Sequence, residues 1–141
     1  MTQRVHEVMT KDPIKLRSSS TVVEAARRMR DAAIGAVVVE DDGGRICGIV
    51  TDRDIAIRTV AAERDPKTTK LSDVCSKSLA MLSADEQVDR AVEIMREKAV
   101  RRVPVVDTQN NVVGIVSIGD LAQLRDPASA LGQISAAPPN R

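Results

Sequence analysis

The chain has 141 residues, with 21 Lys and Arg against 20 Asp and Glu and a formal net charge of +1. This balance excludes the broad cationic field of a non-specific nucleic-acid binder, and the absence of Phe, Tyr and Trp excludes aromatic stacking of single-stranded nucleic acid. The longest apolar stretch, residues 32–39, is far shorter than the roughly 20 residues of a membrane span, so no membrane helix is predicted.

The N-terminal residues lack the apolar core of a secretion signal, so we expect a cytoplasmic protein.

The few cysteines and the single histidine limit the redox and metal-binding chemistry that the chain can support. Cys47 and Cys75 suit a reducing compartment; Cys47 is expected to be a small buried hydrophobe, and Cys75, near a loop, the more reactive thiol. His6 has no companion ligands, so no metal site is predicted and His6 is expected at the surface.

An internal repeat organises the chain. The segment Gly48 to Asp54, Gly-Ile-Val-Thr-x-x-Asp, returns at Gly114 to Asp120 as Gly-Ile-Val-Ser-x-x-Asp, an offset of 66 residues (114 minus 48). The same offset, without a gap, aligns the pairs Val8 and Val74, Leu16 and Leu82, Val22 and Val88, Ala25 and Ala91, Met29 and Met95, and Val37 and Val103. We therefore predict two copies of one structural unit.

Each copy is expected to begin with a short strand and an amphipathic helix. The strands are predicted at Ile14–Leu16 and Ala80–Leu82. Thr21 with Glu24, and Ser83 with Glu86, have the spacing of a capping box at a helix start. The helices then show one apolar stripe at i, i+3, i+4 and i+7. The stripe residues are Val22, Ala25, Ala26 and Met29 in the first copy and Val88, Ala91, Val92 and Met95 in the second.

Two β-branched runs and a last helix complete each copy. The runs are Ala36–Val39 with Ile46–Val50, and Val103–Val106 with Val112–Val116. Turn-forming residues separate them at 41–44 and 107–111. The last helices are expected near Asp52 and Ile118. The prediction is an α/β (α+β) fold in which each copy has the order β-α-β-β-α and helices cover the sheet.

The domain boundaries follow from the repeat and from composition. We predict the first copy at residues 1–62, a charged linker containing Pro66 at 63–70 and the second copy at 71–125. Residues 126–141 are expected to be a mobile or partly helical tail. At this length the two copies are expected to share a core, so that neither is stable alone.

Two corners carry the residues with chemical potential. Thr51 with Asp54, and Ser117 with Asp120, lie where a strand is expected to meet a helix. A hydroxyl followed three residues later by an acid is itself a helix cap. The same groups can bind a nucleotide, because a hydroxyl and N–H groups at a helix start suit phosphate and a carboxylate accepts ribose hydroxyls. The pattern alone leaves both interpretations open.

Three stretches resemble the tandem CBS-domain pair, or Bateman module. They are Val8-Met9-Thr10-x-Asp12-Pro13, Gly48-Ile49-Val50-Thr51-Asp52-Arg53-Asp54-Ile55 and Arg101-Arg102-Val103-Pro104-Val105-Val106, and the resemblance covers about Val5 to Leu124. It implies two pseudo-twofold-related halves packed sheet to sheet, with clefts that hold AMP, ADP, ATP or S-adenosylmethionine in many members. It also implies a non-catalytic regulatory role and a homodimer.

The resemblance also implies roles for individual residues. Asp54 and Asp120 would hold the ribose. The phosphate would bind to Thr51, Ser117, Arg101 and Arg102. The base would lie against Pro13, Ile14, Val37, Leu79, Ala80, Val103 and Pro104. The alternative for the two arginines is a solvated strand edge. The first copy has Gly35 and Ala36 at the matching positions. We therefore expect the second cleft to be the stronger phosphate site, and the first to be weaker, to take a less charged ligand or to be vacant.

The residues leave two alternatives to a nucleotide sensor whose output passes to a partner protein. One is a ligand-free interaction scaffold that uses outer helices such as Asp52–Val60. The other is an enzyme, which the sequence does not favour because it offers no activated nucleophile, metal cluster or acid–base pair.

Overall fold

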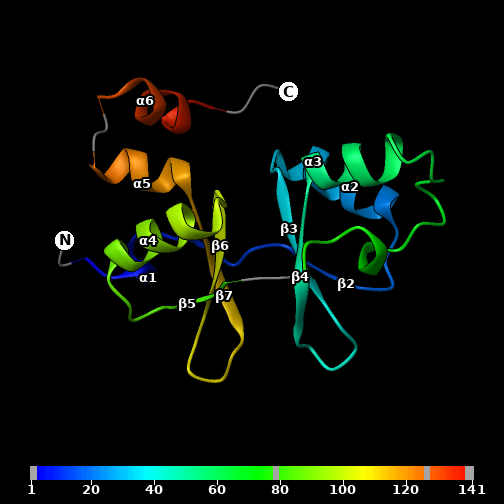
Figure 1. Ribbon diagram of the computed structural model, residues 1–141, viewed down its shortest axis with the longest axis horizontal. Helices are drawn as coiled ribbons and strands as arrows, with labels where there is room; N and C mark the ends of the chain where they lie inside the picture. The colour runs from blue at the N-terminus through cyan, green and yellow to red at the C-terminus, as the bar shows by residue number, and fades with distance from the viewer. Residues whose placement is uncertain (1–2, 78–79, 126–127, 139–141) are drawn as a thin grey trace. The chain divides into compact units, whose positions relative to one another are not determined.

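The computed structural model describes residues 3–77, 80–125 and 128–138 and divides into two compact units (Figure 1). The first-repeat unit comprises residues 14–77. The second-repeat unit joins residues 3–13 to 80–125 and 128–138. Residues 3–13 therefore pack with the second copy of the repeat, although they precede the first copy in sequence.

The first-repeat unit is a three-stranded sheet with helices over one face. Its elements are β2 (Lys15–Arg17), α2 (Val22–Ala32), β3 (Ala36–Glu40), β4 (Ile46–Thr51), α3 (Asp52–Ile55), the π-helical turn η1 (Ala56–Val60) and the 3₁₀ turn η2 (Leu71–Asp73). Strand β3 pairs in parallel with β2 and antiparallel with β4. Val22 and Met29 of α2 pack against Val37 and Val50 of the sheet in one apolar cluster.

The second-repeat unit repeats this plan and adds elements at both ends. Its elements are α1 (Val5–Val8), β1 (Thr10–Lys11), β5 (Leu82–Ser83), α4 (Val88–Lys98), β6 (Arg102–Val106), β7 (Val112–Ser117), α5 (Ile118–Arg125) and α6 (Ala130–Ala136). The sheet order is β1-β7-β6-β5. Val88 and Ile94 of α4 pack with Val103 and Val116 of the sheet. The predicted mixed α/β fold with the order β-α-β-β-α in each copy is confirmed.

Equivalent entry segments extend one edge of each sheet, beyond β7 in one unit and beyond β4 in the other. Thr10 of β1 pairs antiparallel with Ile115 of β7. Ser76, 66 residues after Thr10, pairs in the same way with Ile49 of β4: Ile49 N donates to Ser76 O at 3.2 Å, and Ser76 N donates to Ile49 O at 2.9 Å. Each copy therefore supplies its entry segment to the sheet of the other copy.

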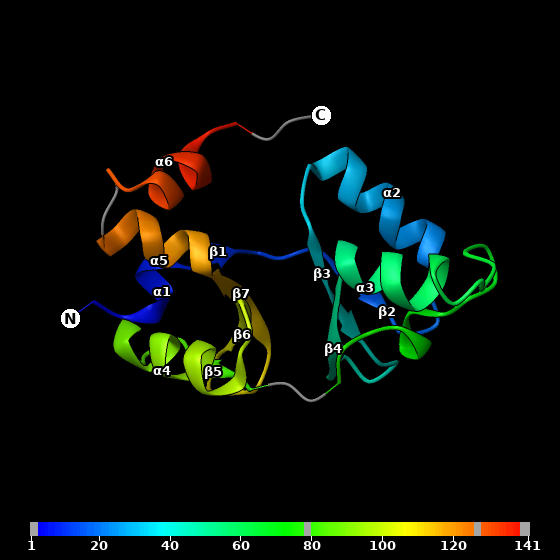
Figure 2. The ribbon, with the colours of Figure 1, turned by 45° about the horizontal axis from the view of Figure 1, so that its top comes forward.

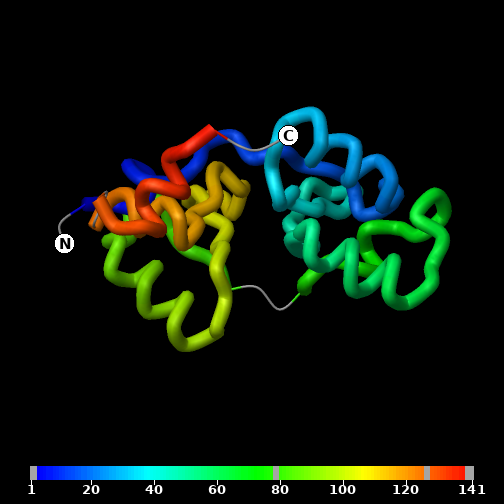
Figure 3. The backbone as a smooth tube through the Cα atoms, turned by 90° about the horizontal axis from the view of Figure 1, so that it is seen from above, coloured from blue at the N-terminus to red at the C-terminus, as the bar shows by residue number. Residues whose placement is uncertain are grey.

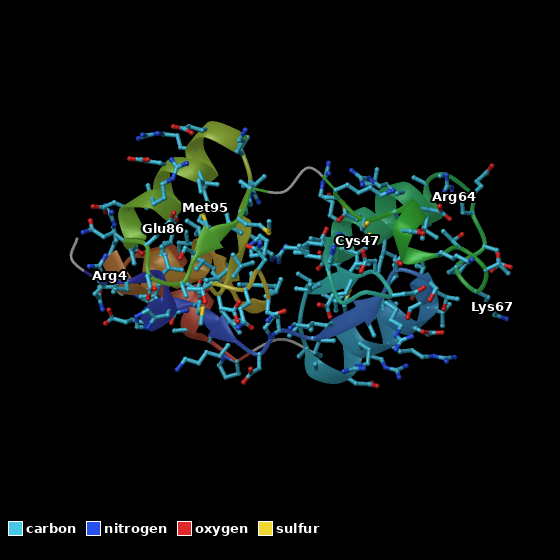
Figure 4. All side chains as sticks on the ribbon, turned by 90° about the horizontal axis from the view of Figure 1, so that it is seen from below. Arg4, Cys47, Arg64, Lys67, Glu86 and Met95 are labelled. Atoms are coloured by element: carbon cyan, nitrogen blue, oxygen red, sulfur yellow. The ribbon has the colours of Figure 1, made fainter. Side chains whose placement is uncertain are left out.

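The segment predicted as a linker lies against helix α2. The amide of Val22 donates to the carbonyl of Thr69 at 3.0 Å, and the amide of Val23 donates to the carbonyl of Pro66 at 3.0 Å. These bonds satisfy two of the N–H groups that a helix start leaves without intrahelical partners. Arg64 and Lys67 point outward at the far end of the unit (Figure 4). Residues 66–69 therefore belong structurally to the first-repeat unit.

The predicted capping box at Ser83 and Glu86 is wrong. Ser83 ends strand β5, and helix α4 begins at Val88 after Gln87, whose side chain makes no capping hydrogen bond. In the first copy the prediction of a cap is correct, because Thr21 Oγ1 accepts from the amide of Glu24 at 3.3 Å. The repeat offset places Gln87, not Ser83, at the position of Thr21, and glutamine lacks the short hydroxyl side chain that caps well.

The predicted apolar stripes also need correction. Ala26 is exposed, because α2 faces the sheet along Val22, Ala25 and Met29, and Ala26 is rotated about 100° away from Ala25. In α4 the buried residue near the end of the stripe is Ile94, which is not a member of the predicted stripe. Met95 is half-buried and packs at the edge of the core. In the ranges that the structure describes, no helix has the length and apolar character needed to span a membrane.

Candidate functional site

The first candidate corner lies where β4 passes into α3. The amide of Thr51 donates to Asp54 Oδ2 at 2.9 Å, and the amide of Asp54 donates to Thr51 Oγ1 at 3.1 Å. Asp54 is 9% exposed. This reciprocal pair is a capping box that holds the hydroxyl and the carboxylate in one orientation.

The second candidate corner, between β7 and α5, has the same geometry. The amide of Ser117 donates to Asp120 Oδ2 at 2.9 Å, and the amide of Asp120 donates to Ser117 Oγ at 3.2 Å. Asp120 is half-buried. Both sequence repeats therefore build the same local structure, and the capping interpretation is correct at both corners.

Capping leaves part of each polar group for a ligand. Only Oδ2 of Asp54 and of Asp120 accepts a hydrogen bond within the described part of the chain, so Oδ1 of each is a fixed acceptor without a protein donor there. The hydroxyls of Thr51 and Ser117 accept from an amide, and neither donates its proton to a residue in the described ranges. Each corner thus offers one oriented acceptor and one hydroxyl donor.

The strand register brings one arginine beside the second corner. Arg102, the first residue of β6, pairs directly with Ser117 of β7. Directly paired residues project from the same face of a sheet with Cβ atoms about 4.5–5.5 Å apart. The neighbouring pair, Val103 and Val116, faces the apolar core, so Arg102 and Ser117 lie on the opposite face. Arg101 is also exposed, and its carbonyl accepts from the amide of Ile118 at 2.9 Å.

The first corner has no cation at the matching place. Ala36 pairs with Thr51 as Arg102 pairs with Ser117, and the carbonyl of Gly35 accepts from the amide of Asp52 at 3.0 Å. Gly35 and Ala36 are therefore the structural equivalents of Arg101 and Arg102, as the repeat offset of 66 residues indicates. The two corners differ in charge although their backbones correspond.

The residues expected to hold a base lie in different environments. Val37 and Val103 are fully buried in the apolar clusters, so their side chains are directed into the cores and only their backbone can reach a ligand. Pro104 is buried and pairs with Ile115, on the face of the sheet that carries Arg102. The remaining members are Pro13, Ile14 and Ala80, which are half-buried, and Leu79, which lies outside the described residues.

The cysteines reverse the order of accessibility expected from the sequence. Cys75 is 4% exposed within the apolar cluster of the first-repeat unit, whereas Cys47 on β4 is half-buried (Figure 4). Burial raises the pKa of the Cys75 thiol above its ordinary value, and the nearby Cys47 adds to the effect. The expectation that Cys75 is the more reactive thiol is wrong, because its loop folds over β4. In the ranges described, His, Cys, Asp and Glu side chains nowhere gather in threes as a metal ion requires.

Gly119, the second residue of α5, lies beside the second corner but was not among the residues predicted for the site. An alanine Cβ there would lie 2.7 Å from Ser135 Oγ of α6 and 3.6 Å from Ser117 Oγ. A signal was available, since the repeat offset places Arg53 at the matching position of the first copy. The two corners therefore differ at this position, because the second has Gly119 where the first has the long, cationic Arg53.

A family model of the CBS domain matches this chain twice, at residues 5–59 and 71–126. CBS domain-containing protein YhcV of Bacillus subtilis is 40% identical over 118 residues, which cover 84% of this chain and 82% of YhcV. Hypoxic response protein 1 of Mycobacterium tuberculosis is 37% identical over 103 residues, or 73% of this chain and 71% of that protein. Protein MK0525 of Methanopyrus kandleri is 34% identical over 120 residues, which cover 85% of this chain and 61% of MK0525.

Solved structures give the same result. The crystal structure of hypoxic response protein I with two coordinated zinc ions has a TM-score of 0.76 and 32% identity, covering 86% of this chain and 98% of that one. The CBS domain pair of protein MJ0100, in complex with 5'-methylthioadenosine and S-adenosyl-L-methionine, has a TM-score of 0.78 and 28% identity. That match covers 88% of this chain and 96% of the MJ0100 chain.

Proposed function

Because this chain belongs to the CBS-domain family, we propose that it is a regulatory module that binds an adenosine-type ligand at its two strand-to-helix corners. The ligand class comprises AMP, ADP, ATP and S-adenosylmethionine. The complex of the related MJ0100 pair with two adenosine compounds supports this class. The proposal involves no catalytic step, and the ligand acts by favouring one arrangement of the module over another.

The observation that carries the proposal is the duplicated capping box with a free acceptor. At each corner the amides fix the carboxylate through Oδ2 and leave Oδ1 oriented by the fold. An ionised carboxylate accepts hydrogen bonds from the adjacent 2'- and 3'-hydroxyls of ribose without reorganisation. A sugar is thus the chemical group that Asp54 and Asp120 are best suited to bind.

Phosphate would bind at the second corner. Ser117 supplies a hydroxyl donor, and Arg102, directly opposite on the neighbouring strand, supplies a guanidinium that can bind two phosphate oxygens at once. Arg101, exposed next to it, adds charge that attracts an anion. We propose AMP, ADP or ATP as the ligand class of this corner.

A less charged ligand suits the first corner. Ala36 stands opposite Thr51 there, so phosphate would meet a hydroxyl without a guanidinium. A neutral or cationic adenosine compound, such as a thioether or S-adenosylmethionine, has no phosphate to neutralise, so it loses less affinity where Ala36 replaces the arginine of the second corner. The base would lie against Ile14 and backbone near Val37 at this corner, and against Ala80, Pro104 and backbone near Val103 at the other.

A second candidate function is a ligand-free interaction scaffold. Ile57 and Val60 on the π-helical turn are 51% and 70% exposed, which favours a docking role for the segment from Asp52 to Val60. This alternative predicts an intact fold with no affinity for nucleotides. The homodimer, the partner protein and the cytoplasmic location remain predictions from the sequence.

Calorimetric titration with AMP, ATP and S-adenosylmethionine tests the proposal. Asp120→Asn keeps a capping oxygen but removes the charge, and we expect it to weaken AMP binding about 10–100-fold, as loss of a charge-assisted hydrogen bond of about 1.5–3 kcal/mol requires. Arg102→Ala should weaken ATP more than S-adenosylmethionine. Arg96→Ala, an exposed arginine on α4, is the matched control and should change neither affinity.

The outcome separates the two candidate functions. Unchanged affinity in both Asp120→Asn and Asp54→Asn would remove the ribose assignment. Absence of binding for all three compounds would favour the scaffold. Because the chain has no Trp or Tyr, a nucleotide absorption band in the purified protein would directly report a ligand that co-purifies, and mass spectrometry of the denatured sample would identify it.

A further inference from the structure

Helix α6 lies alongside α5 in the second-repeat unit (Figures 1, 2 and 3). It spans only Ala130–Ala136, and Ser129 caps it by accepting from the amide of Gly132 at 3.0 Å. Its larger apolar residues face outward, with Leu131 43% and Ile134 72% exposed, whereas Gly132 is buried. The helix therefore packs through small residues, which allows its backbone to approach α5 closely.

Helix α6 comes near the second corner at Gly119 of α5. The point that a Cβ on Gly119 would occupy is 2.7 Å from Ser135 Oγ, 3.1 Å from Ser135 Cβ and 3.6 Å from Ser117 Oγ. The hydroxyl of Ser117, which is proposed to bind phosphate, and the side chain of Ser135 on α6 thus both lie near the Cβ position of residue 119. A phosphate group bonded to Ser117 Oγ on this side, at the usual distance of about 2.6–2.8 Å, would extend toward the space that Ser135 borders.

The first corner differs at the equivalent position. Arg53 stands at the position equivalent to Gly119, and α3 continues into the π-helical turn Ala56–Val60. A side chain as long as arginine at residue 119 would prevent α6 from packing where it does. Within the described ranges, the contact of a tail helix with this position occurs at the corner that carries Arg102.

Helix α6 is weakly held. Its hydrogen bonds lie within the tail: Gln133 N donates to Ser129 O at 2.9 Å, and Gln133 Nε2 donates to Ala128 O at 2.7 Å. Across the described part of the chain, no hydrogen bond or ion pair joins residues 130–136 to α5. A helix of seven residues is not stable by itself in water. Its position depends on small apolar contacts, so it can leave α5 without disturbing the core.

We propose that α6 is an autoinhibitory cover that competes with the phosphate of a nucleotide for the Ser117–Asp120 corner. The inference rests on the function proposed above, since it concerns access to that site. If α6 is docked in nine of ten molecules, the apparent affinity for a phosphate-bearing ligand is about tenfold weaker than the intrinsic affinity. A partner that binds the exposed Leu131 and Ile134 and draws the helix away would then raise nucleotide affinity.

Two substitutions at one exposed position test the cover in the full-length chain. Gln133→Pro removes the Gln133 amide bond and breaks the helix, whereas Gln133→Ala, the matched control, removes only the side-chain bond to Ala128. We expect Gln133→Pro to bind AMP about tenfold more tightly than wild type and Gln133→Ala to bind as wild type does. Ser135→Leu replaces no residue of the corner, and its larger side chain does not fit against Gly119; it should therefore displace α6 and reproduce the effect of Gln133→Pro.

Hydrogen exchange at residues 118–121 and 130–136 provides a readout that needs no ligand. Faster exchange in Gln133→Pro at both segments would show that the helix has left. AMP binding that is equal to or weaker than wild type in that state overturns competition and leaves the proposed function intact. Absence of AMP binding in wild type and in both displaced variants overturns the proposed function and the cover together.

Discussion

Gly48 is the position at which the exchanged entry segment can be tested most sharply. In a Gly48→Ala variant the new Cβ would lie 2.3 Å from the carbonyl oxygen of Ser76 and 3.1 Å from Cys75 Sγ. The obstacle is backbone, and it is held by two hydrogen bonds to Ile49. The Ser76 carbonyl must therefore move by about 1 Å to reach an ordinary contact distance.

The cost of this movement can be worked out from its parts. Two ladder hydrogen bonds contribute about 0.5–1.5 kcal/mol each, and overpacking a close contact costs about 1–3 kcal/mol. We expect Gly48→Ala to lower the free energy of unfolding by about 2–4 kcal/mol in total, since the two terms partly overlap. In a protein of this size that corresponds to a fall in melting temperature of roughly 5–15 °C.

Far-UV circular dichroism during urea and thermal unfolding is the appropriate assay, because the chain lacks Trp and Tyr for fluorescence. Gly43→Ala in the exposed β3–β4 turn is the matched control; its Cβ would meet only Asp41 Oδ1, at 3.4 Å. We expect the control to stay within about 0.5 kcal/mol of wild type. Equal stability of the two variants would show that Ser76 is not paired with β4.

Two other effects on stability are expected. One comes from the helix cap that α2 has and α4 lacks, and the other from the buried thiol of Cys75. Thr21→Ala should lower the free energy of unfolding by about 0.5–2 kcal/mol because it removes a helix cap. Gln87→Ala, at the equivalent position of the second copy, should leave the free energy of unfolding unchanged. Equal losses of stability for the two variants in urea titrations would contradict the difference in capping. Burial raises the pKa of Cys75 above its ordinary value of 9.0, so its neutral thiol supports the fold below that pH and the support is lost as pH rises through the folded-state pKa. Wild type should therefore lose stability above pH 9.0 more steeply than Cys75→Ala, and parallel pH profiles of the two would refute this coupling.

Local patterns predicted most of the secondary structure and both corners. The β-branched runs became β3, β4, β6 and β7, and the serine or threonine followed by an acid became a capping box in each copy. A capping box depends on hydrogen bonds between residues three positions apart, and the β-branched composition of a strand can be recognised without its partner strand. The failures were also local in origin, since Ser83 has the residue types of a cap but lies in the strand before the helix.

The sequence by itself determined the duplication, the order of strands and helices, and the presence of a hydroxyl and an acid at each corner, because these follow from short-range periodicity and spacing. Only the tertiary structure decided that Thr10 and Ser76 each close the other copy's sheet, that Arg102 stands opposite Ser117, that Cys75 is buried, and that Ser135 rests on Gly119. These are contacts between segments far apart in the chain, or depend on them, and their free energy comes from packing and strand pairing that appear only when the segments meet.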